Sequence, residues 1–192
     1  MNPSRRPERR RRRRGSVAVE FTLLAPILAV LGLAVLDVVD FLRIALRLER
    51  TAGEVVNVVA QYQALREADF ATIFDLAGRV AAPYRVTQSD GAVILTGLGN
   101  TGTGAMVMWQ RRQGSGGYAS AFGTEGGAAT IPARSADLSL AVGQGALVAE
   151  IFYAREPWVL SGRFLTADPF SRLQAFALQR PRMVSILRIS TP

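Results

Sequence analysis

The strongest constraint in this sequence is an apolar segment that lies directly behind a cluster of arginines. Residues 21–36 contain no charged side chain, and the wider segment 17–36 is interrupted only by Glu20, Thr22 and Pro26. At about 1.5 Å per residue, twenty residues form a helix roughly 30 Å long, which equals the hydrocarbon thickness of a bilayer. The segment is therefore predicted to be a helix that spans a membrane.

The positive charge of the chain is concentrated before this segment. The net charge is +8, but residues 1–15 hold eight arginines and Glu8, whereas the rest of the chain holds fifteen arginines and fourteen carboxylates. Arginines beside a spanning segment stay on the cytoplasmic side, so the N-terminus is predicted to be cytoplasmic and the C-terminal domain periplasmic or extracellular. Nucleic-acid binding is disfavoured, because the nearly neutral remainder offers no basic face.

The residue types that the chain lacks exclude much catalytic chemistry. No cysteine or histidine is present, which removes disulfides, thiolate and imidazole metal ligands, and the base that many enzymes use near neutral pH. Residues 97–102 match the G-x-G-x-x-G dinucleotide fingerprint, yet they lead into another predicted strand and not into the helix that such a site needs. We therefore predict a glycine-rich hairpin loop there, and no enzyme activity, cofactor or metal site in the chain.

Glu20 is unusual because it places a carboxylate at the entrance of the apolar segment. A secretory signal or an uncleaved membrane anchor would explain a basic start, but neither explains this charge. Cleavage between Gly15 and Ser16 would leave an α-amino group on Ser16, one helical turn from Glu20 and on the same face. The carboxylate is costly in lipid, and it would then pair with that amine or with the amine of a neighbouring subunit.

Residues 15–21, GSVAVEF, resemble the class III prepilin processing site of tight-adherence (Flp-type) pilus systems, and residues 19–27 resemble the start of the TadE-like minor pilins, or pseudopilins. In that family a prepilin peptidase cuts after the glycine, and the fifth mature residue is glutamate. The resemblance implies that Gly15 and Ser16 flank the cleaved bond and that Glu20 pairs with an amine during assembly. Major pilins have tyrosine after the glutamate and almost no chain beyond the helix. Here Phe21 and about 125 residues beyond the helix favour a minor pilin.

The same resemblance implies partners and a location. The expected partners are the prepilin peptidase, other minor pilins, the major pilin and the inner-membrane assembly platform, with membrane lipid around the helix. The protein would sit in the inner membrane and later enter the pilus or its initiation or tip complex. The alternative is a single-pass, membrane-anchored binding or adhesin domain outside the cytoplasm that is never processed.

The long helix is predicted to have two differently built halves. The first half carries small residues at spacings of 4, 3, 4 and 3, which lets another helix approach closely, although small residues are also simply common in membrane helices. Pro26 should bend the helix or open it locally. The second half repeats apolar residues at the same spacing and continues to about Arg66, and either a partner helix or the chain's own sheet must cover them. The small residues are Ala18, Thr22, Ala25, Ala29 and Gly32, and the apolar ones are Phe41, Ala45, Leu48, Ala52, Val55, Val59 and Tyr62.

The whole chain is predicted to be an α+β protein, with a pilin-like fold by the resemblance. We expect a leader at residues 1–15, a long helix at 16–66 whose transmembrane half is 17–36, and a soluble α+β domain at 67–192. In that domain Asp69 should cap a short amphipathic helix over 70–80, with Phe70, Ile73, Phe74 and Ala77 on its apolar side. A C-terminal antiparallel sheet should follow. Its expected strands are 92–98, 105–111, 146–155 and 182–190, and residues 108–111 and 148–153 also look like the C-terminal region of TadE-like proteins.

Glu150 is the most unusual charge in the predicted sheet, since Val148 and Phe152 share its face. A buried carboxylate is a catalytic candidate only when groups of matching chemistry accompany it. Without histidine or cysteine there is no such constellation. We therefore expect an arginine inside the fold to pair with Glu150, either Arg155 or Arg188.

Overall fold

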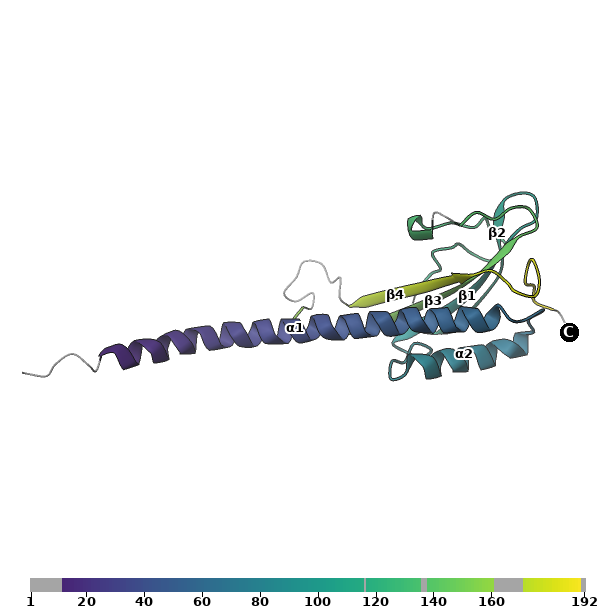
Figure 1. Ribbon diagram of the computed structural model, residues 1–192. Coiled ribbons are helices and arrows are strands. Elements are labelled where there is room, and N and C mark those ends of the chain that lie inside the picture. The colour runs from purple at the N-terminus through teal and green to yellow at the C-terminus, as the bar shows by residue number, and fades with distance from the viewer. Residues whose placement is uncertain (1–11, 116, 136–137, 161–170, 191–192) are drawn as a thin grey trace, which may run out of the picture.

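The computed structural model describes residues 12–115, 117–135, 138–160 and 171–190, with the backbone alone for residues 12–16 and Arg134. Two helices precede a four-stranded sheet, which confirms the α+β arrangement predicted from the sequence (Figure 1). The first helix projects far beyond the other elements, which gather around its C-terminal half. The elements are α1 (Arg12–Val59), α2 (Glu67–Ala81), β1 (Gly91–Asn100), β2 (Ala105–Gly114), β3 (Gly145–Ala154) and β4 (Arg172–Gln179), with a short 3-10 turn, η1 (Ala133–Ser135), before β3.

α1 is a single helix of 48 residues, so its length is about 72 Å at 1.5 Å per residue. It begins at Arg12, inside the predicted leader, and continues through Pro26. The local opening expected at this proline therefore does not divide the helix. One rod joins the start of the apolar segment to the sheet domain.

The predicted continuation of this helix to Arg66 is wrong, because α1 ends at Val59. The N–H groups of residues 60–62 still donate to carbonyls at the end of the helix, but the carbonyl of Ala60 and the main chain of Leu65 pair with the C-terminal segment. The N–H of Arg182 donates to the carbonyl of Ala60 at 2.9 Å, and Leu65 forms a parallel bridge to the same segment. A tertiary contact thus ends a helix that the apolar periodicity alone would extend.

α2 begins at Glu67, and Arg66 occupies its N-cap position. The prediction that Asp69 caps this helix is therefore wrong. Its carboxylate still accepts a hydrogen bond from the N–H of Arg66 at 2.7 Å, so it satisfies a terminal donor from the third helical position. The expected apolar side of α2 is buried and consists of Phe70, Ile73, Phe74 and Ala77.

The four strands form one antiparallel sheet in the order β2-β1-β3-β4. The first three predicted strands are confirmed to within three residues at each end. The fourth is wrong: β4 is Arg172–Gln179, and residues 182–190 form no strand. In the first half of the true strand, buried Leu173 and Ala175 alternate with exposed Arg172 and Gln174, and its apolar run, residues 175–178, is only four residues long.

Different elements cover the two faces of the sheet. One face packs against α1 and α2 in a core that includes Leu48, Ala52, Val55 and Val59. The chain's own domain therefore covers the apolar seam predicted on the second half of α1. The opposite face lies under the connection between β2 and β3, which contributes the fully buried Phe122 (Figure 1).

The β1–β2 hairpin accounts for the G-x-G-x-x-G match. A hairpin is confirmed, but residues 97–100 form the end of β1 and only residues 101 and 102 belong to the turn toward β2, so most of the match lies in the strand and not in the predicted loop. A Cβ atom on Gly97 would lie 2.2 Å from the indole of Trp109. The register shifts directly after this glycine, and the bulge at Met108 turns Trp109 toward the helices while Val107 faces the opposite core. Gly97 therefore serves the packing of Trp109.

Candidate functional site

The N-terminal half of α1 exposes most of its apolar surface. The large apolar side chains of residues 17–36 are 40% to 67% exposed, and the most apolar 18 residues of this helix are only 6% buried within the chain. A core helix of a soluble domain would be mostly buried, which this one is not. By length and composition, α1 is a helix that can cross a membrane.

The predicted processing residues lie at the end of α1 that is farthest from the sheet (Figure 1). Gly15 and Ser16 fall within the first five residues of the helix, and Glu20 lies on its exposed surface. Residues four apart on a helix share a face and are separated by about 6 Å along its axis. The helix therefore brings Ser16 and Glu20 to the same side.

The stripe of small residues lies on the open surface of α1. Ala18, Thr22, Ala29 and Gly32 are exposed and Ala25 is half-buried. A Cβ atom built on Gly32 would meet nothing within 4 Å. The hydroxyl of Thr22 donates to the carbonyl of Ala18 at 2.7 Å, so this polar group is satisfied inside the helix and is compatible with an apolar neighbour. The stripe is thus accessible to a second helix.

Asp37, the first residue after the apolar segment, joins α1 to the sheet domain. Its side chain is 2% exposed and forms an ion pair with Arg155, the residue that follows β3. The guanidinium Nη2 lies 2.7 Å from Asp37 Oδ1, and Nη1 donates to the main-chain carbonyl of Asp37 at 2.9 Å. Asp40 is more distant, with 3.6 Å between its Oδ2 and the same Nη2. We call the pair of Asp37 and Arg155 the junction.

Three successive main-chain N–H groups complete the surroundings of the Asp37 carboxylate. Trp158 N–H donates to Oδ1 at 2.9 Å, while Val159 N–H and Leu160 N–H donate to Oδ2 at 2.7 and 3.1 Å. Every partner of the carboxylate is a donor, so the site suits an ionised group. The junction therefore holds the turn at residues 157–160 against α1.

Glu150 is fully buried in β3, and the prediction that an arginine pairs with it is wrong. Its carboxylate accepts hydrogen bonds from the hydroxyl of Ser120, from the N–H of Ala121 at 2.9 Å and from Nε2 of Gln174 at 3.4 Å. Burial raises the pKa of Glu150, and these three hydrogen bonds offset only part of that shift. The chain from β2 to β3 supplies neutral donors here, whereas Arg155 binds the carboxylate on α1.

The sequence pattern does not reveal the junction, because Asp37 and Arg155 lie 118 positions apart and share no periodicity. The only local sign is that both residues stand at the ends of predicted elements, the apolar segment and a strand. Arg188, the other candidate partner of Glu150, accepts a hydrogen bond from the N–H of Leu65 through its main-chain carbonyl. The partners of Asp37 and of Glu150 are therefore both set by contacts between segments that are far apart in the sequence.

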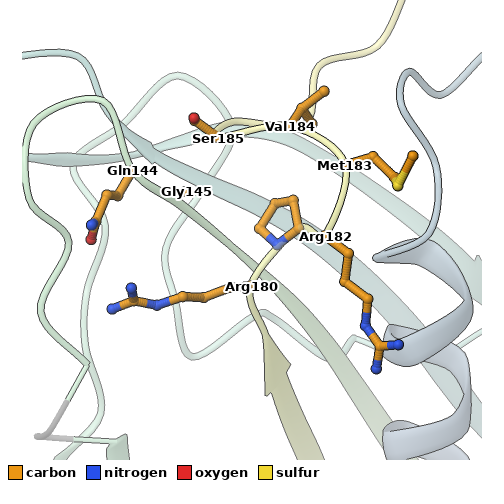
Figure 2. Close-up of a pocket in the computed structure, with 8 residues that line it drawn as sticks. Gln144, Gly145, Arg180, Arg182, Met183, Val184 and Ser185 are labelled. Carbon is orange, nitrogen blue, oxygen red and sulfur yellow. The ribbon is translucent and has the colours of Figure 1, made fainter.

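A hollow of about 390 Å³ lies where β3 begins, at the end of the sheet opposite to the junction, and residues 180–185 line most of it. Figure 2 shows the side chains of Arg180 and Arg182 pointing in different directions. Arg182 Nη2 donates to Asn57 Oδ1 at 2.6 Å, which ties this segment to α1. None of the lining residues is acidic, and the described part of the chain holds no cluster of three or more potential metal ligands.

Comparisons of the chain with protein-family models, with curated proteins and with solved structures found no match. The features that bear on function are therefore those of the molecule itself. They are an apolar helix half that the chain leaves exposed, a carboxylate near the start of that half, and a buried ion pair at its end.

Replacing Asp37 with asparagine should lower the free energy of unfolding by about 3 kcal/mol, because it leaves the Arg155 guanidinium buried without its paired charge. Denaturant unfolding of the full-length protein in detergent measures this loss. Asp40→Asn is the matched control, since Asp40 is 55% exposed and should contribute about 1 kcal/mol or less. Equal losses in the two variants would contradict the role given to Asp37.

Replacing Glu150 with glutamine should stabilise the protein increasingly as the pH rises. Burial raises the pKa of Glu150 above its ordinary value of 4.5, so the folded state holds this proton more tightly than the unfolded state. The unaltered protein therefore loses stability as the pH rises through the folded-state pKa, and the glutamine variant does not share that loss. The difference in unfolding free energy between the two proteins, followed from acidic to mildly alkaline pH, checks this. Glu156→Gln, at an exposed position, controls for the removal of one carboxylate, and a difference independent of pH would contradict the prediction.

Proposed function

We propose that this protein is a minor pilin, or pseudopilin, of a tight-adherence pilus and that it is made as a membrane-inserted precursor. The observation that carries the proposal is the division of α1, whose apolar first half is exposed while its second half has one face buried against the chain's own domain. The first half of such a helix can lie in lipid or in a bundle of helices, and its second half carries a folded domain outside the membrane. The likeness of residues 15–21 to a prepilin processing site supports the same function.

In the precursor, residues 17–36 lie in the inner membrane, the arginine arm stays in the cytoplasm and the sheet domain lies in the periplasm. The peptidase hydrolyses the bond between Gly15 and Ser16. This bond is close to the start of α1, where helices fray most readily. The new ammonium group of Ser16 then lies one turn from the carboxylate of Glu20, which also benefits from the positive end of the helix dipole.

During assembly the apolar half of α1 leaves lipid for a bundle of pilin helices. The stripe from Ala18 to Gly32 allows the backbones to approach closely, and Glu20 pairs with its own amine or with that of a neighbour. The partners are the inner-membrane assembly platform, other minor pilins and the major pilin, and the product enters the pilus or its initiation or tip complex. The work is binding and assembly, with no turnover, cofactor, metal or nucleic acid involved.

Co-expression with the cognate prepilin peptidase should yield a mature chain that begins at Ser16, lacking residues 1–15. Intact-mass measurement and N-terminal sequencing of the membrane-extracted protein check this. Gly15→Leu should prevent cleavage because it enlarges the residue before the cut bond, and Val17→Leu is the conservative control beyond it. Recovery of the full-length chain from cells with active peptidase would leave only an uncleaved, membrane-anchored binding domain.

Glu20→Ala should leave cleavage intact but reduce co-purification with co-expressed pilins by roughly tenfold, the effect of about 1.4 kcal/mol, because the amine loses its partner. Glu20→Asp should retain part of the interaction. Gly32→Leu should weaken co-purification as well, since it fills the stripe, while the space around Gly32 within the chain leaves the fold undisturbed. Leu33→Ile is the matched control on the same helix. Unchanged co-purification in Glu20→Ala and Gly32→Leu would remove the assembly roles of the carboxylate and the stripe.

A further inference from the structure

Trp158 is a large aromatic side chain that the fold leaves in the open, with 72% of its surface exposed. The other tryptophan, Trp109, is 3% exposed and its indole N–H donates to the carbonyl of Leu187 at 2.8 Å. The two positions differ sharply, although both belong to the sheet domain. Packing in the core explains why a tryptophan stands at position 109, but it does not explain why one stands at position 158.

The junction determines where Trp158 lies along α1. Its own N–H bonds the carboxylate of Asp37 at 2.9 Å, and the next two N–H groups bond the same carboxylate. Arg155, just before this turn, holds both the side chain and the main-chain carbonyl of Asp37. The turn at residues 157–160 therefore stays at the level of residue 37, directly after the 20-residue apolar segment.

The level of residue 37 corresponds to a defined depth in the bilayer once residues 17–36 fill the hydrocarbon layer. The next residue of the helix then lies in the headgroup layer, because each residue advances the helix by only about 1.5 Å. Tryptophan is the side chain most suited to that layer, since its ring is apolar while its N–H is a hydrogen-bond donor. Outside α1, the other large apolar side chains described as exposed are Val142 and Met183. They flank the start of β3, whose ten residues place them about 30 Å from the junction.

We propose that the turn at residues 157–160 docks on the lipid bilayer, with the Trp158 indole in the headgroup layer on the side where the sheet domain lies. This inference rests on the membrane-spanning role of α1 in the proposed function, but not on processing or assembly. The contact holds the domain on the membrane surface at a set height and rotation about α1. Extraction of α1 from the membrane then breaks the lipid contact of Trp158 together with those of the helix.

Tryptophan fluorescence of the full-length protein in lipid nanodiscs tests the proposal, since both membrane faces are then open to an aqueous quencher. Nanodiscs of phosphatidylethanolamine and phosphatidylglycerol carry a nitroxide either near the headgroups or deep in the acyl chains. The Trp109→Phe variant leaves Trp158 as the single reporter. We expect emission at shorter wavelength than in water, stronger quenching by the shallow nitroxide than by the deep one, and protection from aqueous acrylamide.

Two matched reporters, both in the Trp109→Phe/Trp158→Phe background, separate the possible failures. Leu28→Trp, in the middle of the apolar segment, should be quenched most by the deep nitroxide, which establishes that α1 spans. Met183→Trp, at the far end of the domain, should respond to acrylamide and to neither nitroxide. If Trp109→Phe impairs folding, the difference in signal between unaltered protein and Trp158→Phe reports Trp158 with Trp109 in place.

The reporters make each result decisive. A deep Leu28→Trp signal together with an acrylamide-accessible Trp158 would overturn the lipid contact while leaving the anchor intact. Absence of deep quenching at Leu28→Trp would overturn the membrane anchor and the lipid contact together. A Trp158 shielded from acrylamide and from both nitroxides would show that protein and not lipid covers it, which also contradicts the proposal.

Discussion

The structure depends on one constraint, which is that the apolar surface of the first half of α1 is left uncovered by the residues that the structure describes. Twelve large apolar side chains between residues 17 and 36 are at least 40% exposed. Each contributes roughly 1.5–3 kcal/mol when it is fully removed from water, so this half is stable in lipid or against other helices and not in water. In the proposed function the same surface meets both environments in turn, first as an anchor and then as part of a fibre.

The second half of α1 meets a different condition, because the domain buries one of its faces, while Leu42 and Leu46 of the same half remain exposed. Both faces of the sheet are covered, one by α1 and α2 and the other by the connection between β2 and β3. Phe122 and Trp109 each fill one of the two cores. In the described part of the chain both sheet faces are covered while the first half of α1 is exposed, and in the proposed function this asymmetry favours assembly through the helix over assembly through the sheet.

The junction of Asp37 and Arg155 lies at the boundary between these two halves. Buried ion pairs contribute little net stability, because desolvation of the two charges offsets their attraction, but an unpaired member is costly. The clearest consequence of this pair is therefore positional. It fastens the end of β3 and the following turn to one level of α1, and so it places Trp158 at the level of Asp37, where the apolar segment 17–36 ends. Glu150, by contrast, is buried among neutral donors and stays inside the domain.

The sequence by itself determined the features that arise from neighbouring residues. Helical periodicity predicted the long rod, its two halves and the buried side of α2, because residues three and four apart share a helix face. Runs of β-forming residues between glycines predicted β1, β2 and β3. The processing site at Gly15 and Ser16 stays a prediction, which follows from the resemblance of residues 15–21 and from the one-turn spacing of Ser16 and Glu20.

Only the tertiary structure decided where distant segments meet. α1 ends at Val59 because the C-terminal segment pairs with the residues that follow it, and β4 is a strand because β3 offers it an edge. The partners of Asp37 and Glu150 come from positions 29 to 123 residues away, apart from Gln174 at 24. The hydrogen-bond donors of a buried carboxylate are those that the tertiary fold places within reach of it. Local sequence patterns therefore do not predict them.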